Sequence, residues 1–68
     1  GEYDKALEKT DLLLALGHRS SEVYVAKGEA YLYKHSYTEA LECFDKALEL
    51  DSDSEEALEH KENVIQLL

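Results

Sequence analysis

The sequence predicts an all-α fold, and three of its features support this prediction. The 68 residues include no proline, and the helix formers Ala, Leu, Glu and Lys dominate the composition. Apolar residues recur at spacings of three and four, which is typical of amphipathic helices. The sequence also repeats itself, because residues 1–34 align with residues 35–68. A chain of this length forms one small domain at most, whose net stability rarely exceeds about 3–5 kcal/mol.

The alignment pairs identical residues in the predicted turns as well as in the predicted helices. The pairs include Tyr3 and Tyr37, Asp11 and Asp45, Ser20 and Ser54, and Lys27 and Lys61. Coincidences are common in a chain rich in Ala, Leu and Glu, so the agreement between turn residues carries more weight. The sequence therefore predicts helix pairs that repeat every 34 residues.

The first helix is expected over residues 3–16. Ala6, Leu7, Leu13 and Leu14 lie on one of its faces, and Gly17 ends it, because glycine readily adopts the left-handed conformation of a helix C-cap. The second helix is expected over residues 22–34. Ser20 and Ser21 provide its N-cap, and Glu22 places negative charge in its first turn.

A glycine stands in the middle of this second helix, on the same arc as Tyr24, Lys27 and Tyr31. Gly28 costs a helix about 1 kcal/mol relative to alanine, so its presence requires a reason. We expect a neighbouring helix to approach closely at this point.

The third helix is expected to open with a capping box of Ser36 and Glu39 and to run to residue 50. Its inward residues would be Ala40, Leu41, Phe44, Ala47 and Leu48. The fourth helix is expected over residues 55–68. Two capping boxes fit its start, one with Ser52 and Glu55 and one with Asp53 and Glu56.

The central stretch, residues 21–54, resembles a tetratricopeptide repeat. The family's pattern is carried by six residues that we expect to define the fold: Tyr24, Gly28, Tyr31, Ala40, Phe44 and Ala47. Two positions depart from it, since Lys27 replaces a preferred Leu and Ser52 a preferred Pro. The resemblance implies antiparallel helix-turn-helix repeats that stack into a short right-handed α-solenoid of four helices.

When the 34-residue repeat is extended in both directions, residues 1–20 resemble the second helix of a preceding repeat. Residues 55–68 resemble the first helix of a following repeat or a capping helix. These flanks match less well, because Thr10, Leu13 and Glu62 replace the family's Phe, Ala and Gly. Since the first residue is Gly1 rather than Met, we expect a domain from a longer protein, which then continues the solenoid or dimerises through its exposed end helices.

Sixteen acidic and seven basic residues give a net charge of -9, which disfavours binding to nucleic acids and anionic membranes and favours basic partners. The single Cys43 cannot form an internal disulfide, and no apolar run is long enough for a membrane span. We therefore expect a soluble protein of a reducing compartment such as the cytoplasm.

The sequence predicts no enzyme, cofactor or metal site. His18, His35 and Cys43 lack the close spacing of zinc ligands, and His60 with Glu56 one turn earlier is interpreted as a contact on a helix surface. The acidic run 51–56 lacks the glycine and the ligand spacing of a calcium-binding EF-hand, and no catalytic motif is present.

The resemblance instead implies a scaffold that binds a peptide or helix of another protein in a concave groove. The residues expected to line this groove are Glu22, Val25, Glu29, Leu32, Tyr33, Glu56, Glu59 and Asn63, with Gln66 and Leu67 beside them. Such a surface would suit apolar anchors flanked by Lys or Arg, but not the acidic tail EEVD that one subclass of the family binds. The alternative is a purely structural segment that self-associates or stacks on neighbouring repeats.

Overall fold

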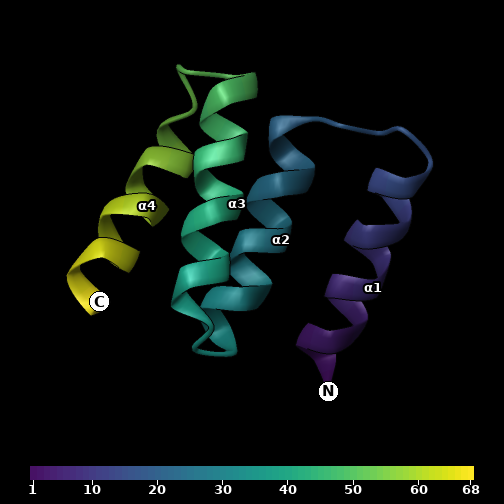
Figure 1. Cartoon of the computed structure of the whole chain (residues 1–68), viewed down its shortest axis with the longest axis horizontal. Coiled ribbons are helices and arrows are strands. Elements are labelled where there is room, and N and C mark those ends of the chain that lie inside the picture. Colours follow the sequence, from purple (N-terminus) through teal and green to yellow (C-terminus); the bar gives the residue numbers. More distant parts are fainter.

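The computed structural model describes all residues, 1–68, and contains four α-helices and no strands. The helices are α1 (Glu2–Ala15), α2 (Ser21–Tyr33), α3 (Tyr37–Leu50) and α4 (Glu55–Leu67). Successive helices run antiparallel, so both termini and the α2–α3 turn lie at the same end of the molecule (Figure 1). The predicted all-α fold is confirmed, and each predicted helix boundary lies within one residue of the observed one.

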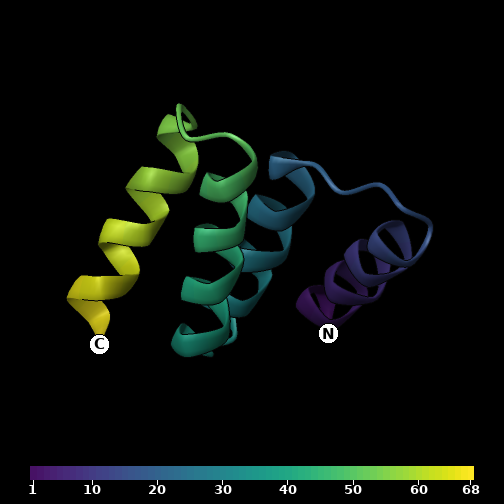
Figure 2. The same ribbon diagram turned by 45° about the horizontal axis from the view of Figure 1, so that its top comes forward.

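The four helices form a flat array that measures 31 × 28 × 14 Å. Each helix packs against the next along the chain, with α2 and α3 in the closest association (Figure 2). Helix α2 also contacts α4, whereas α1 contacts neither α3 nor α4. Helices α2 and α4 therefore share one face of the array.

Two helices end in the same hydrogen-bonded motif. Gly17, with a φ of +91°, follows α1, and the amides of Gly17 and His18 donate to the carbonyls of Leu14 and Leu13. His35, with a φ of +63°, follows α2 in the same way, since the amides of His35 and Ser36 donate to residues 32 and 31. Both sets of bonds satisfy carbonyls that the helix itself leaves unpaired.

The helix starts agree only in part with the predicted caps. Ser20 caps α2 by accepting a hydrogen bond from the amide of Val23. Ser36 precedes α3, but its side chain makes no capping bond, so the predicted box with Glu39 is wrong. Both boxes considered for α4 are also wrong, because Ser54 is the N-cap and accepts from the amide of Ala57. The carboxylate of Asp51 bonds the amide of Asp53, which fixes the turn just before this cap.

The core lies between α2, α3 and α4 and is built from small and medium side chains around one aromatic ring. Its buried members are Val25, Ala40, Phe44, Ala47, Ala57 and Val64. Tyr24 and Tyr31 are partly buried and pack against this cluster. The six residues predicted to define the fold therefore all lie in or against the core, with Gly28 buried as well.

Gly28 is buried where α2 faces Phe44 of α3. A Cβ atom at Gly28 would lie 2.5 Å from Phe44 Cε1 and 2.8 Å from its Cζ, well inside van der Waals contact. The aromatic ring thus occupies the space that any other side chain would need. The close approach expected from the sequence is confirmed, and it explains why the helix contains a glycine here.

The contact between α1 and α2 repeats as the contact between α3 and α4. Lys27 Nζ lies 2.9 Å from Asp11 Oδ1, and Lys61 Nζ lies 2.7 Å from Asp45 Oδ1, at positions that are equivalent across the 34-residue period. The hydrogen bond to Asp11 raises the pKa of Lys27 above its usual value. The α1–α2 and α3–α4 pairs are therefore joined by equivalent Lys–Asp ion pairs.

Cys43 is buried on α3, and its burial raises the pKa of the thiol to about 11. Because the thiolate is the reactive form, alkylation of the folded chain by iodoacetamide at neutral pH should be at least about 100-fold slower than that of the unfolded chain. Mass spectrometry of samples quenched over time, with and without concentrated urea, measures this ratio. Equal rates in the two conditions would mean that Cys43 is not buried.

Candidate functional site

The larger of two pockets on the face shared by α2 and α4 lies at the end of the array that carries both termini. It has a volume of about 740 Å³ and draws residues from all four helices and the α2–α3 turn. We call it the aromatic pocket, and its lining residues are Tyr3, Leu32, Tyr33, His35, Tyr37, His60, Asn63, Gln66 and Leu67. Three tyrosines and two leucines make it mainly apolar, with amide and imidazole groups between them.

Two contacts hold the start of α1 against the end of α2 at the edge of this pocket. The rings of Tyr3 and Tyr33 stack with their centroids 5.4 Å apart. Lys34 donates a hydrogen bond to Asp4, and this bond together with the lysine charge lowers the pKa of Asp4. These exposed contacts fix the direction of the Tyr33 ring, which remains 53% exposed.

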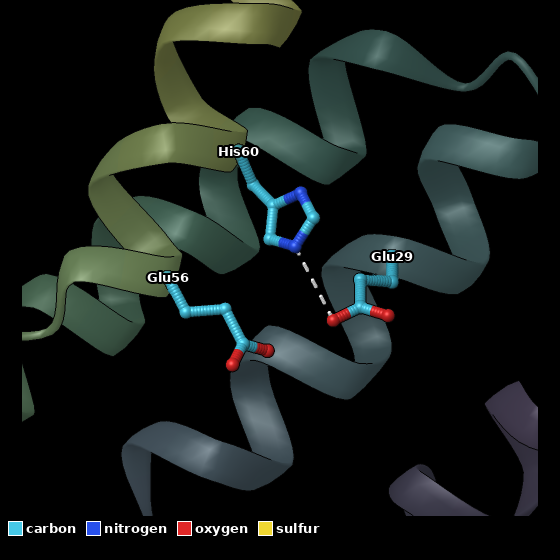
Figure 3. Close-up of side chains that lie close together, drawn as sticks. All are labelled: Glu29, Glu56 and His60. Atoms are coloured by element: carbon cyan, nitrogen blue, oxygen red, sulfur yellow. Dashed lines mark ion pairs between the residues drawn. The ribbon is translucent and has the colours of Figure 1, made fainter.

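Three ionisable side chains meet midway along the face shared by α2 and α4 (Figure 3). They are Glu29 of α2 and Glu56 and His60 of α4, which we call the Glu–His cluster. Their ligand atoms all lie within 4.8 Å of one another, and His60 Nε2 is 3.4 Å from Glu29 Oε1. Figure 3 shows the carboxylate of Glu56 pointing toward the same space as the other two groups.

The ring of His60 is fixed by the core beneath it. It stacks on Phe44 with the ring centroids 5.2 Å apart and the planes 15° from parallel. Its Nδ1 is buried and has no hydrogen-bond partner, so a neutral ring would carry its proton on Nε2. In that tautomer Nε2 carries the hydrogen that faces Glu29.

The carboxylate of Glu29 lies in an unfavourable position. Burial raises its pKa, the neighbouring carboxyl group of Glu56 raises it further, and His60 opposes this rise only in part. Two carboxyl groups that share a site repel one another when both are charged. A cation placed beside Glu29 and Glu56 would relieve this repulsion.

A second, smaller pocket continues the same face toward the opposite end of the helices. It has a volume of about 120 Å³, and we call it the acidic pocket. Its lining residues are Ser21, Glu22, Val25, Ala26, Glu29, Ser54 and Glu56. The Glu–His cluster joins the two pockets, because His60 lines the aromatic pocket and the two glutamates line the acidic one. We call this continuous surface the inner face.

The structure distributes the predicted groove residues unequally over the inner face. Leu32, Tyr33 and Asn63 line the aromatic pocket, as do the neighbouring residues Gln66 and Leu67. Glu22, Val25, Glu29 and Glu56 line the acidic pocket, whereas Glu59 is exposed and lines neither. A role in binding for the residues that line the two pockets remains a prediction.

The predicted exposure of one groove residue is wrong. Val25 was expected to be a surplus apolar residue on an open face, but it is only 5% exposed, although it also lines the acidic pocket. It belongs to the same buried cluster as Ala57 and Val64 of α4. Helix α4 thus packs onto α2 and covers most of the Val25 side chain.

Sequence reasoning missed several residues of the inner face. Tyr3 and Tyr37 line the aromatic pocket, and their alignment across the internal repeat was the signal that could have pointed to them. His60 and Glu56 were recognised as neighbours on a helix, but no local pattern indicated that Glu29 would join them. Helix α2 supplies this third group only through tertiary packing.

Comparisons with known proteins agree with the helical architecture. A family model described as a tetratricopeptide repeat matches residues 21–54, which is half of the chain. No curated protein and no solved structure matches the sequence. Repeats of this type are non-enzymatic and generally mediate interactions between proteins. None of the four helices is long and apolar enough to cross a membrane.

Proposed function

We propose that this chain, which belongs to the tetratricopeptide repeat family, binds a segment of a partner protein across its inner face. The observation that carries the proposal is an apolar pocket that adjoins a pair of carboxylates on one continuous surface. The partner segment we propose is a peptide or helix with an apolar anchor and a lysine or arginine near it.

The aromatic pocket is suited to the apolar anchor. Its volume of about 740 Å³ lies within the roughly 300–1,000 Å³ that is common for ligand sites. Tyr33 and Leu67 are 53% and 54% exposed, so they offer apolar surface that a partner can cover. Burying an apolar side chain against them provides affinity, and the amides of Asn63 and Gln66 can bond the partner's backbone.

The Glu–His cluster is suited to the basic residue. The ammonium of a lysine or the guanidinium of an arginine would neutralise the charges of Glu29 and Glu56 and remove their mutual repulsion. The net charge of -9 would also speed the encounter with a basic segment. The two parts of the inner face therefore select for different residues of one segment.

An array of random peptides probed with the labelled chain tests this proposal. We expect bound sequences to be enriched in an apolar residue followed or preceded within a few positions by Lys or Arg. Tyr33→Ala and Glu56→Gln should each weaken binding of a selected peptide by about 5–30-fold, since each removes one of the two contacts. Both residues are exposed and lie outside the buried core, so neither change should unfold the chain.

Two matched variants control for general effects of side-chain loss. Leu12→Ala removes a side chain that is 60% exposed on α1, outside the inner face, and Glu59→Gln removes one charge from α4 outside both pockets. Both should bind the selected peptide with unchanged affinity. The proposal is wrong if Leu12→Ala weakens binding as much as Tyr33→Ala, or if acidic peptides such as one ending in EEVD are selected.

Self-association is the second candidate, and a specific feature favours it. Leu58 and Ile65 of α4 and its C-cap Leu68 are 43%, 52% and 68% exposed, and their spacing puts them close together. Such a stripe could pack on a neighbouring repeat or on another copy of the chain. Sedimentation equilibrium of the wild type and of Ile65→Glu distinguishes the candidates, because only self-association predicts a mass that rises with concentration and falls in the variant.

A further inference from the structure

We propose that the Glu–His cluster is also a binding site for a zinc ion, with Glu29, Glu56 and His60 as its three protein ligands. These residues come from two helices that are separate in the sequence. The inference does not depend on the binding of a partner segment.

The spacing of the ligand atoms fits a tetrahedral metal. Zinc binds nitrogen and oxygen at about 2.0–2.2 Å, so two of its ligand atoms lie roughly 3.3–3.6 Å apart. His60 Nε2 and Glu29 Oε1 are 3.4 Å apart, within this range. Glu56 lies one helical turn before His60, and its carboxylate needs only a small rotation, since all three ligand atoms are already within 4.8 Å.

The types of ligand favour zinc over magnesium or calcium. An imidazole nitrogen suits zinc and other late transition metals, whereas magnesium and calcium prefer oxygen ligands alone. The Phe44 ring stacked on His60 fixes the plane of the imidazole. Figure 3 shows Nε2 directed at the carboxylate of Glu29. The solvent side of the cluster leaves the fourth position to water, because Glu56 is exposed.

One feature limits the affinity of this site. Metal binding at His60 Nε2 requires the proton to move to Nδ1, which is buried without an acceptor. Outer hydrogen bonds of this kind are worth about 10–100-fold in metal affinity, and this site lacks one. We therefore expect reversible binding that is lost with chelators and weakens as the pH falls, because the ligands must be deprotonated.

Titration of the full chain with zinc chloride tests the proposal. We expect one zinc ion per chain by calorimetry, shifts of the His60 imidazole signals by NMR, and a rise in Tm of at least about 4 °C at saturation, since the ion connects α2 to α4. Magnesium chloride should produce none of the three. Glu56→Gln should weaken zinc binding at least about tenfold, whereas Glu59→Gln on the same helix should leave it unchanged.

Two further variants test whether the imidazole of His60 is a zinc ligand. His60→Gln should abolish the binding, while His18→Gln, at an exposed histidine after α1, should leave it unchanged. If His60→Gln fails to fold, the comparison of Glu56→Gln with Glu59→Gln alone tests the zinc site. The proposal is overturned if these two variants weaken zinc binding equally, or if magnesium produces the same response as zinc. Either result would mean that cations bind non-specifically to an acidic surface. Tyr33→Ala should bind zinc normally, so a failure of the peptide proposal is distinguishable from a failure of this one.

Discussion

Replacing Phe44 by alanine is expected to leave most of the chain unfolded at room temperature. Phe44 is fully buried, is the largest buried side chain, and contacts the core from its centre. Truncating such a phenylalanine typically costs about 3–5 kcal/mol, through lost transfer free energy and the cavity that remains. A domain of this size has about 3–5 kcal/mol in total, so the variant retains little or no stability.

Urea unfolding followed by circular dichroism measures the effect of Phe44→Ala. The matched control is Leu50→Ala, which truncates a 49% exposed side chain on the same helix and should change the free energy of unfolding by less than about 0.5 kcal/mol. If Phe44→Ala still unfolds cooperatively with a loss of less than about 1 kcal/mol, the ring is not the centre of the core.

Replacing Gly28 by alanine is expected to destabilise the chain, although alanine is the better helix former. The intrinsic gain in a helix interior is about 1 kcal/mol. The added Cβ opposes this gain, because it would lie 2.5 Å from the Phe44 ring. It would force α2 and α3 apart or push the ring out of its position. Overpacking of this kind costs about 1–3 kcal/mol. Because all three nearest atoms belong to one buried ring, we expect this cost to exceed the gain in helix propensity.

A double-mutant cycle isolates the cause of this effect. Phe44→Leu removes the ring atoms that face Gly28, so the combination of Gly28→Ala with Phe44→Leu should be less destabilised than the sum of the single changes. Thermal unfolding of the four proteins gives the coupling energy. A rise in Tm for Gly28→Ala alone would contradict the close approach of the two helices.

Local patterns in the sequence were sufficient to predict the helices and their main packing residues. The spacing of apolar residues, Gly17 after the first helix and Ser20 before the second gave boundaries correct to one residue. Gly28 even indicated where two helices meet, because a glycine in a helix interior is costly without a compensating contact. These signals act within a few residues of chain, which is why they can be read directly.

The errors concern features that depend on packing between distant segments. Val25 was misplaced because only the position of α4 on α2 decides whether that side chain is covered. The contact of Glu29 with His60 has the same origin, since nothing near either residue in the sequence indicates the other. The missed cap at Ser54 has a different cause, because several adjacent residues of the turn could each have served as N-cap.

The location of a bound peptide on the chain is the most direct test of the central claim. In a titration of the isotope-labelled chain with a selected basic and apolar peptide, NMR reports the amide shifts of each residue. We predict the largest shifts at Tyr33, Asn63 and Leu67 around the aromatic pocket, and none at Leu12 or Ile65. Shifts confined to Leu58, Ile65 and Leu68 on α4, or shifts that depend on the concentration of the chain alone, would contradict binding at the inner face.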